Sequence, residues 1–300
     1  MQGSLPVCPI CGAAMRSQRL SWLYRCGACG FLKAALSRRI ESEASRAVVN
    51  ESRRERGLNG LRLANFERIL DRLQQVRGPD RNARGRALLD VGCAHGWFLD
   101  AAAARGFDAI GLEPDSSIAA TAASGGRKIR SGFFPDDVPA NERFDVISFN
   151  DVFEHLPDIE AAMAACARLL KPDGLLVLNV PCRRGVFYRL AAALERIGLA
   201  GPLERLWQIH FASPHFSYFA PVDLRRLAGR HGLMEIHRSS LPSVRLRGLW
   251  PRLSYDTTAS TFSNAVIWLG VAIVSPFLAL LPADISLQIF QRAADGRDDL

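Results

Sequence analysis

The chain has 300 residues, of which 48% are hydrophobic and 23% charged, a composition typical of a globular protein with an apolar core. This excludes a disordered tail and a small disulfide-stabilised scaffold, and the length allows one large α/β domain with a smaller unit attached. The formal charge of +8 is compatible with a nucleic acid or an anionic membrane surface as partner, and equally with an arginine-rich surface that has no function.

Four of the seven cysteines lie near the start of the chain, in two Cys-x-x-Cys pairs that are each followed by glycine. Glycine allows the tight turn in which backbone amides face thiolate sulfurs, and four thiolates form a closed tetrahedral zinc site. The spacing predicts a zinc ribbon over residues 1–36 with structural zinc, bound by Cys8, Cys11, Cys26 and Cys29. The first residues lack the pattern of a secretion signal, so we expect a cytoplasmic protein, in which disulfides are rare.

Residues 37–80 are rich in Arg, Glu, Ala and Leu, and we interpret them as a helical connector. Gly57 and Gly60 predict a break between two helices. The second helix should pack one face on the main domain, because apolar residues recur there at helical spacing: Leu63, Phe66, Leu70 and Leu73.

Within residues 81–241 short apolar runs alternate with helical stretches. Strands separated by helices predict an α/β fold, a doubly wound and mostly parallel Rossmann-like sheet with helices on both faces. The predicted strands cover residues 87–91, 109–112, 128–130, 144–149, 175–180 and 234–237.

A loop of small residues, from Asp90 to Gly96, connects the first of these strands to a helix. Small residues let the backbone approach a ligand closely, and the start of a helix offers N–H groups to it. Glu113 follows the second strand, at roughly the twenty-residue offset of an acid that binds both ribose hydroxyls. The pattern indicates a nucleoside-type cofactor. A dehydrogenase is disfavoured because the loop lacks the GxGxxG spacing.

In order and spacing, these segments resemble the class I S-adenosylmethionine-dependent methyltransferases, in the branch that acts on small molecules such as sugars and quinones. The resemblance covers about residues 86–241 and rests on LLDVGCAHGWFL, AIGLEPD, FDVISFNDVFEHLPD and LLKPDGLLVLNVP. It implies that the loop binds the methionine part of the cofactor, that Glu113 binds the ribose, and that Phe133 or Phe134 lies near the adenine. The implied cofactor-binding residues are Asp90, Gly92, Cys93, Ala94, Gly96, Glu113, Pro114, Phe133 and Asn150.

The chain departs from this family at two points. Ala94 stands where the family has a glycine, and its methyl group fits if the residue keeps a negative φ. The family's sheet also ends in an antiparallel hairpin whose last strand we do not find. That strand is either missing or supplied by the region around residues 244–246.

Candidate catalytic residues follow the fourth strand, at the carboxyl edge where ligands of open α/β sheets bind. The resemblance implies that Glu154 and His155 face the acceptor, and an imidazole can remove its proton. A cap or a loop hydrogen bond is the structural alternative. His215 matches a His-x-x-x-Phe segment that lines the acceptor site in the same families. Outside the ribbon, we recognise no group with metal-binding spacing.

The chain ends in an extension, residues 242–300, with an apolar run for which we expect one helix over residues 264–282. Seventeen consecutive residues of this run carry no charge, and this length is near the short limit for a bilayer span. The helix could span the membrane, lie on its inner surface, or be a buried helix or dimer contact.

Three functions remain open. The leading hypothesis is transfer of a methyl group from S-adenosylmethionine to a sugar, a lipid-linked glycan or a quinone-like acceptor. A zinc-ribbon RNA methyltransferase is the alternative, since some ribosomal-RNA enzymes join such a ribbon to this fold. The sequence NDVFEH after the fourth strand argues against it, because amino-group methylases carry an Asn-Pro-Pro-aromatic motif at that position. The third hypothesis, a non-catalytic, membrane-docked binding module, rests on Ala94 alone.

Overall fold

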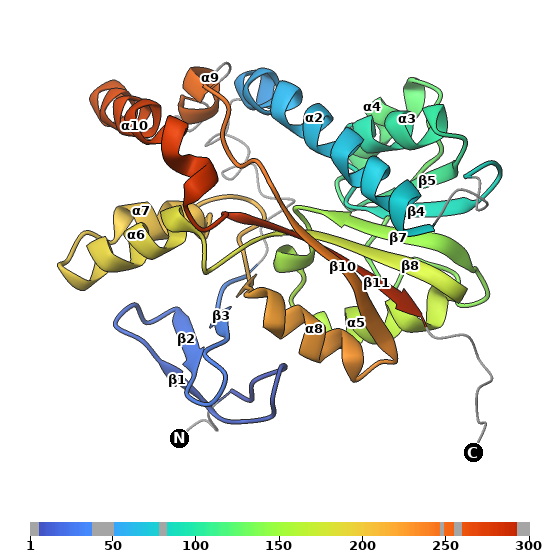
Figure 1. Ribbon diagram of the computed structural model, residues 1–300, viewed down its shortest axis with the longest axis horizontal. Coiled ribbons are helices and arrows are strands. Elements are labelled where there is room, and N and C mark those ends of the chain that lie inside the picture. Colours follow the sequence, from blue (N-terminus) through green and yellow to red (C-terminus); the bar gives the residue numbers. More distant parts are fainter. Residues whose placement is uncertain (1–5, 38–50, 78–82, 247–248, 255–259, 293–300) are drawn as a thin grey trace.

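The structure, a computed structural model, describes residues 6–37, 51–77, 83–246, 249–254 and 260–292. A large twisted sheet with helices on both faces forms the body, and a small sheet lies beside it (Figure 1). The fold is therefore α/β, as the sequence predicts.

The large sheet has the strand order β10-β11-β8-β7-β4-β5-β6. Of these strands only β11 runs antiparallel to the others. The predicted strands are present, but β8 begins five residues earlier and β10 ends four residues later than predicted. Their bounds are β4 Ala87–Val91, β5 Asp108–Glu113, β6 Ile129–Ser131, β7 Phe144–Asn150, β8 Leu170–Pro181, β10 Leu233–Leu241 and β11 Ile285–Arg292.

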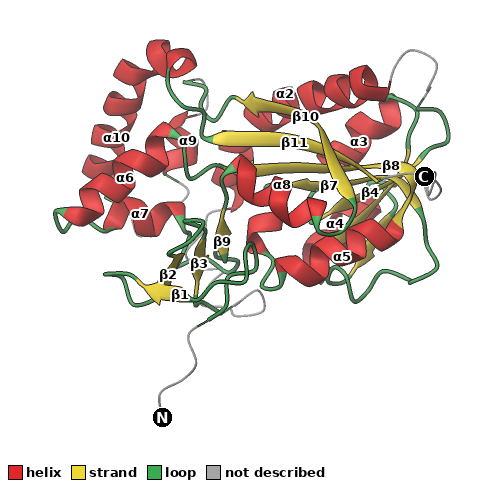
Figure 2. Ribbon diagram, turned by 60° about the horizontal axis from the view of Figure 1, so that its bottom comes forward, coloured by secondary structure: helices red, strands yellow, loops and turns green. Residues whose placement is uncertain are grey.

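Alternate residues of the central strands face two different groups of helices, because side chains of a strand point to opposite faces. Leu88 and Val146 pack with α2 (Glu51–Arg77) and α3 (Trp97–Ala104) on one face. Leu89 and Ile147 pack with α5 (Ile159–Leu169) and α8 (Pro221–Gly229) on the other. A further helix, α4 (Ser116–Ser124), connects β5 to β6. Figure 2 shows the sheet between these layers.

The predicted break in the connector is wrong, because α2 runs unbroken through Gly57 and Gly60. A glycine inside a helix costs about 1 kcal/mol relative to alanine. The same helix buries Phe66, Ile69, Leu70 and Leu73 against the sheet, and burial of one such side chain contributes about 1.5–3 kcal/mol. Packing therefore outweighs the local preference for a break.

The amino-terminal ribbon forms a sheet with a strand from the main domain. Its strands are β1 (Met15–Ser17), β2 (Leu23–Cys26) and β3 (Leu32–Ala34), and β3 pairs with β9 (Ser217–Tyr218). Phe31 of the ribbon packs on Phe219, with the ring centroids 5.7 Å apart. The apolar interior of the ribbon is thus continuous with the core on the α5–α8 face.

The expectation of a missing last strand, or of one around residues 244–246, is also wrong. The strand is β11, which lies between β8 and β10 and pairs Ile285 with Pro181 and Gln291 with Leu175. Its sequence ISLQIFQR places Ser286 and Gln288 in a buried strand. Because these two buried residues are polar, the segment lacks the continuous apolar run from which a buried strand is predicted.

The described residues between β10 and β11 lie at the carboxyl edge of the sheet, where β11 begins opposite the end of β8, and they form a long excursion. The excursion contains α9 (Leu249–Leu253), α10 (Thr261–Val274) and the 3-10 helix η2 (Ser275–Leu280). The single apolar helix expected over residues 264–282 is not found, because α10 ends just before Pro276, which cannot donate a helical hydrogen bond. Among the described helices, none is long and apolar enough to span a bilayer.

Candidate active site

The loop between β4 and α3 adopts three left-handed conformations. The φ angles are 69° at Gly92, 45° at Ala94 and 75° at Gly96. Ala94 therefore does not have the negative φ at which its methyl group would fit without strain, and an L-residue in this conformation costs roughly 1–2 kcal/mol. Gly92 is also held close to the segment after β7, since a Cβ atom there would lie 2.6 Å from Cγ2 of Val152.

Glu113, at the end of β5, ties this loop to the neighbouring strand. Its Oε2 accepts a hydrogen bond from the Ala94 N–H at 2.9 Å, and its Oε1 accepts one from the Asp115 N–H at 3.0 Å. Burial raises the pKa of the carboxyl above its usual range. Each carboxylate oxygen can accept a second bond, so the residue keeps acceptor capacity for hydroxyl groups of a ligand.

Asp90 lies buried beside the loop, at the carboxyl end of β4. Its Oδ1 accepts hydrogen bonds from Ser148 Oγ at 2.7 Å and from Asn150 Nδ2 at 3.0 Å. Burial raises the pKa of this carboxyl to about 7. The buried Oδ1 of Asn150 has no hydrogen-bond partner among the described residues and is an unused acceptor.

The two phenylalanines after β6 have different environments. Phe134 is buried and packs edge-on against Phe149 of β7, with the ring centroids 5.3 Å apart. Phe133 is half-buried, and its N–H donates to Asp137 Oδ2 at 2.7 Å. Phe134 therefore belongs to the core, whereas Phe133 is only partly covered.

A cluster of Glu154, His155 and His215 lies at the same edge of the sheet as the β4–α3 loop, because β7, which leads to it, pairs with β4. Glu154 and His155 belong to η1 (Phe153–His155), which follows β7, and His215 comes just before β9. The rings of the two histidines are 4.5 Å apart, and Glu154 Oε1 is 4.0 Å from His215 Nε2. Burial raises the pKa of Glu154 and lowers the pKa of His215, so both side chains are driven toward their neutral forms.

The four ribbon cysteines converge on one point. Sγ of Cys8 lies 3.6 Å from Sγ of Cys29, and Sγ of Cys11 lies 3.4 Å from Sγ of Cys26. These separations exclude disulfides, in which the sulfurs are about 2.05 Å apart. They are close to the roughly 3.8 Å expected between sulfurs around one tetrahedral zinc with bonds of about 2.3 Å. The ligand set therefore fits a closed zinc site.

Backbone hydrogen bonds connect the ribbon to the histidine cluster. The Ala34 N–H, at the end of β3, donates to the Phe216 carbonyl at 2.9 Å. The Phe216 N–H in turn donates to the Glu154 carbonyl at 2.8 Å. The ribbon thus forms a wall of this site.

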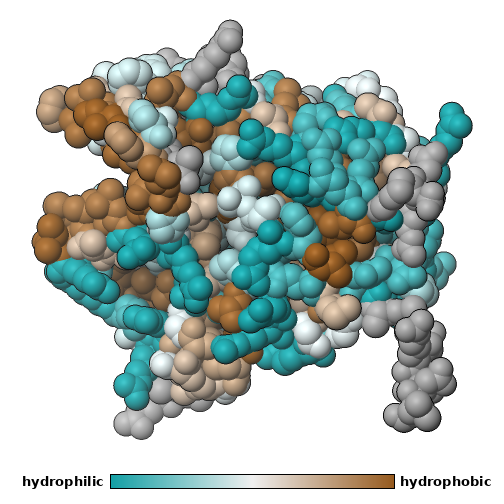
Figure 3. Space-filling view, in the orientation of Figure 1, coloured by the Kyte–Doolittle hydropathy of each residue, from teal (hydrophilic) through white to brown (hydrophobic). Residues whose placement is uncertain are grey.

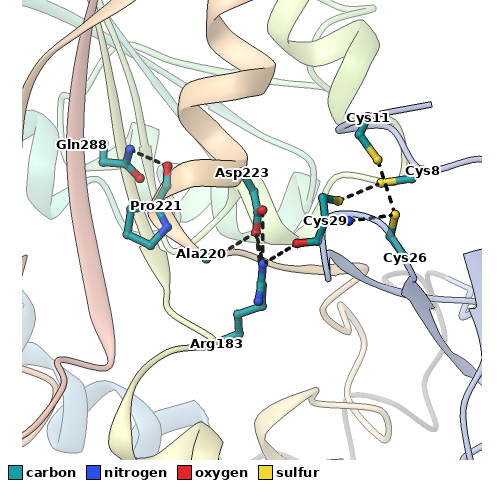
Figure 4. Close-up of polar contacts among 9 residues, drawn as sticks. All are labelled: Cys8, Cys11, Cys26, Cys29, Arg183, Ala220, Pro221, Asp223 and Gln288. Atoms are coloured by element: carbon teal, nitrogen blue, oxygen red, sulfur yellow. Dashed lines mark hydrogen bonds and ion pairs between the residues drawn. The ribbon is translucent and has the colours of Figure 1, made fainter. Parts of the chain in front are cut away.

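A buried ion pair connects the ribbon to α8 (Figure 4). Arg183 Nη2 donates to the Cys29 carbonyl at 3.5 Å and lies 3.0 Å from Oδ2 of the fully buried Asp223. The same Oδ2 accepts the Ala220 N–H at 2.7 Å, and Gln288 Nε2 of β11 donates to the Pro221 carbonyl at 3.0 Å. The ribbon, the start of α8 and the last strand are therefore held together by one network.

Sequence reasoning pointed to most of these residues but not to Ser148 or Gln208. Ser148 lies inside a buried strand, where a single hydroxyl gives no pattern. Gln208 lies in the connection that precedes β9, and only the fold brings its Nε2 to 3.0 Å from His215 Nε2. The sequence also did not indicate that the Glu154 cluster has metal-binding composition, because His215 is distant along the chain.

The sheet order, the small-residue loop and the acid after the second strand define a class I S-adenosylmethionine-dependent methyltransferase fold. The family model described as a methyltransferase domain matches residues 61–237, more than half of the chain, and the chain belongs to this family.

Two curated relatives are ubiquinone biosynthesis O-methyltransferases. The one from Nitrobacter winogradskyi is 33% identical over 178 residues, which cover 54% of this chain and 66% of the relative. The one from Methylococcus capsulatus is 31% identical over 159 residues, which cover 50% and 63%. The chain thus spans slightly less than two thirds of the length of these relatives.

Among solved structures, geranyl diphosphate C-methyltransferase from Streptomyces coelicolor A3(2), in complex with Mg²⁺, geranyl diphosphate and S-adenosyl-L-homocysteine, has a TM-score of 0.55. It is 16% identical, and the match covers 79% of this chain and 81% of that chain. At this identity the likeness concerns the fold alone.

Proposed function

We propose that this protein transfers a methyl group from S-adenosylmethionine to a hydroxyl oxygen of a small, quinol-like acceptor. The observation that carries the proposal is that the glycine loop, Asp90 and Glu113 lie at the carboxyl ends of β4 and β5, while the Glu154 cluster follows β7, which also pairs with β4. The names of the curated relatives support oxygen as the methylated atom and a ring of the quinone type as the acceptor.

The cofactor supplies a methyl group on a positively charged sulfonium. The residues around the loop have the chemistry to bind such a molecule, because Asp90 and Glu113 offer buried acidic acceptors and Asn150 offers an unused carbonyl oxygen. Glu113 would accept the ribose hydroxyls, and the left-handed loop would bring its backbone close to the methionine part. Pro114 and Phe133 would border the adenine.

The acceptor would lie over η1, with His155, Glu154 and His215 beneath its reacting hydroxyl. His155 is half-buried, whereas the other two are fully buried, so it is the member best placed to meet an acceptor. Transfer of the hydroxyl proton to the His155 imidazole would make the oxygen a better nucleophile, and alignment with the methyl group would supply most of the remaining rate enhancement. In this proposal, zinc bound by the four cysteines is structural, since four thiolates leave no open position.

Two apolar arms flank the carboxyl edge of the sheet. The upper arm is formed by exposed residues of α10 and η2, and the lower arm by exposed residues of α6 (Val186–Arg196) and the turn before α7 (Gly201–Leu206). Figure 3 shows both arms as hydrophobic surfaces with a notch between them. The exposed large hydrophobic residues are Phe262, Val266, Ile267, Trp268, Leu269, Ile273, Phe277 and Leu280 in the upper arm, and Leu190, Ile197 and Leu199 in the lower arm.

Contiguous apolar surfaces of this kind mark interaction sites. The arms support attachment of a cytoplasmic protein to the inner face of the membrane, with the acceptor's apolar chain entering from the lipid. The net charge of +8 favours an anionic membrane surface.

The function is tested by incubating the purified protein with S-adenosylmethionine and a panel of quinols and catechols with long and short apolar chains. We expect a methyl ether and an equal amount of S-adenosylhomocysteine, with higher kcat/KM for the long-chain members. Methylation at carbon or nitrogen, or no turnover with any hydroxyl acceptor, would contradict the proposal.

A further inference from the structure

The ribbon carries positive charge that the described residues do not neutralise. Residues 6–37 contain no aspartate or glutamate and four basic residues, Arg16, Arg19, Arg25 and Lys33. Arg19 has partners on α6, since its Nε lies 3.8 Å from Glu195 Oε1 and its Nη1 donates to the Arg196 carbonyl at 3.0 Å. Arg16 and Arg25 are exposed, and neither guanidinium has a hydrogen bond or an ion pair within the part of the chain that the structure describes.

The pairing of β1 with β2 places these two arginines side by side. Arg16 is directly opposite Arg25 in the antiparallel register, so both side chains lie on the same face of the ribbon sheet. Like charges in this arrangement are destabilising. Lys33 does not join them, because it pairs with Tyr24 and therefore lies on the opposite face. The ribbon thus keeps an unfavourable pair of charges that an anionic ligand would relieve.

A third guanidinium, from the main domain, meets Arg25 beside the second Cys-x-x-Cys pair. Gly30 has a φ of 74°, and a Cβ atom built on it would lie 3.7 Å from Arg25 Nη2 and 3.8 Å from Arg183 Nη1. Both nitrogens are therefore within 4 Å of one point. Two oxygens of a single phosphate can bridge donors that lie so close together, through charge-assisted hydrogen bonds of about 2.8 Å.

Arg183 is held in position by contacts that leave one of its nitrogens unused. Its Nε and Nη2 donate to Oδ2 of the buried Asp223 at 3.2 Å and 3.0 Å, and Nη2 also donates to the Cys29 carbonyl (Figure 4). Nη1 has no hydrogen-bond partner among the described residues, and the side chain is 16% exposed. Because the guanidinium is already oriented, an anion that binds Nη1 pays little side-chain entropy.

These arginines lie close to the lower apolar arm. Burial raises the pKa of Tyr188 on α6 to about 12, and the nearby charges of Arg183 and Arg25 act against this rise. Leu190 of the lower arm follows two residues later and is 56% exposed. Figure 3 shows a hydrophilic strip along the lower arm on the side of the ribbon. A ligand with a phosphate group and an apolar chain would meet both kinds of surface here.

We propose that Arg16, Arg25 and Arg183 bind a phosphate group, carried by a phospholipid or by a soluble phosphate compound. Arginine suits this ligand because its planar fork matches two oxygens of a phosphate. Two carboxylates of the region do not compete for Arg25, since Asp223 holds Arg183 and Glu195 lies beside Arg19. None of the three arginines belongs to the cofactor loop or to the Glu154 cluster, so the site does not depend on the proposed function.

The test is calorimetric titration of the full-length protein, without cofactor or acceptor, with pyrophosphate and with dihexanoyl phosphatidic acid below its micelle concentration. We expect saturable binding. Arg25→Ala should raise Kd at least tenfold, and Arg25→Lys should raise it less, because lysine keeps the charge but loses the fork. Arg16→Ala should also weaken binding. Arg196→Ala is the matched control, because Arg196 is exposed at the far end of α6 and should leave Kd unchanged.

The two probes distinguish the sources of the phosphate. Similar Kd values would show that the phosphate group alone is recognised, tenfold tighter binding of the lipid would assign the site to phospholipids, and tenfold tighter binding of pyrophosphate would assign it to soluble phosphates. An absence of saturable heat with both probes, or equal Kd values for Arg25→Ala and Arg196→Ala, would overturn the site. A protein that binds phosphate but transfers no methyl group would contradict the proposed function instead.

Discussion

At the scale of single residues, Ala94 is one of the positions where a left-handed backbone conformation lowers stability. Its φ of 45° is a conformation that glycine adopts without strain. We expect Ala94→Gly to raise the free energy of unfolding by about 1 kcal/mol, as measured by urea denaturation. Ala120→Gly is the control: Ala120 is exposed within α4, where glycine should lower the free energy by a similar amount. A destabilising Ala94→Gly would show that the loop is not strained.

Asp90 should make the stability of the cofactor-free protein depend on pH. Its pKa is raised by burial from 3.8 to about 7, so the folded state holds a proton that the unfolded state has already released. The free energy of unfolding should therefore fall as pH rises from about 4 to about 7, and level off above that. Asp90→Asn should flatten the slope over this window, although Glu113 contributes in the same direction. An unchanged slope in the variant would contradict the assignment.

Sequence reasoning reached these residues because each carries a local signal. Small residues after a strand identify the loop from Gly92 to Gly96, and an acid at the end of the next strand identifies Glu113. The left-handed φ of Ala94 has no such signal, because an alanine in sequence does not reveal its conformation. Ser148 and the proximity of His215 to Glu154 depend on how strands and loops are placed in space, which local patterns do not determine.

At the scale of elements, the strands of the parallel sheet were predictable and the last strand was not. β8 contains the apolar run Leu175–Leu178, and β7 buries Val146, Ile147 and Phe149, as expected for strands covered on both faces. β11 contains the buried Gln288, whose Nε2 donates to the Pro221 carbonyl at 3.0 Å and to Glu235 Oε1 at 2.8 Å. A polar residue satisfied by tertiary contacts interrupts the pattern from which strands are recognised.

The pairing of β3 with β9 makes the ribbon part of the candidate active site. Removal of zinc by Cys26→Ser should unfold the ribbon, because such sites couple metal binding to folding. Since the Ala34–Phe216–Glu154 hydrogen bonds depend on β3, turnover should fall by at least tenfold, while the affinity for S-adenosylmethionine should change little. The measurements are zinc content, methyl transfer and calorimetry. Unchanged turnover in the zinc-free variant would separate the ribbon from the site.

At the scale of the whole molecule, the two apolar arms distinguish this chain from a plain catalytic domain. Phe262 is 79% exposed and Ile273 63%, so their replacement by aspartate should not disturb the core. We expect the double variant to lose at least tenfold in sedimentation with vesicles of phosphatidylglycerol and phosphatidylcholine. Met234→Asp is the control, because Met234 is 66% exposed at the opposite end of β10. Equal sedimentation of both variants would mean that the arms do not bind lipid.

The central claim is that the β4–α3 loop and Glu113 form a site for S-adenosylmethionine, and calorimetric titration tests it most directly. The wild type should bind with saturable heat. Glu113→Ala should weaken binding by about 1.5–3 kcal/mol, or roughly 10- to 150-fold in Kd, because charge-assisted hydrogen bonds are lost. Glu113→Gln, which keeps an acceptor oxygen, should lie between the two. An absence of heat with the folded wild type, or equal affinity in Glu113→Ala, would contradict the claim.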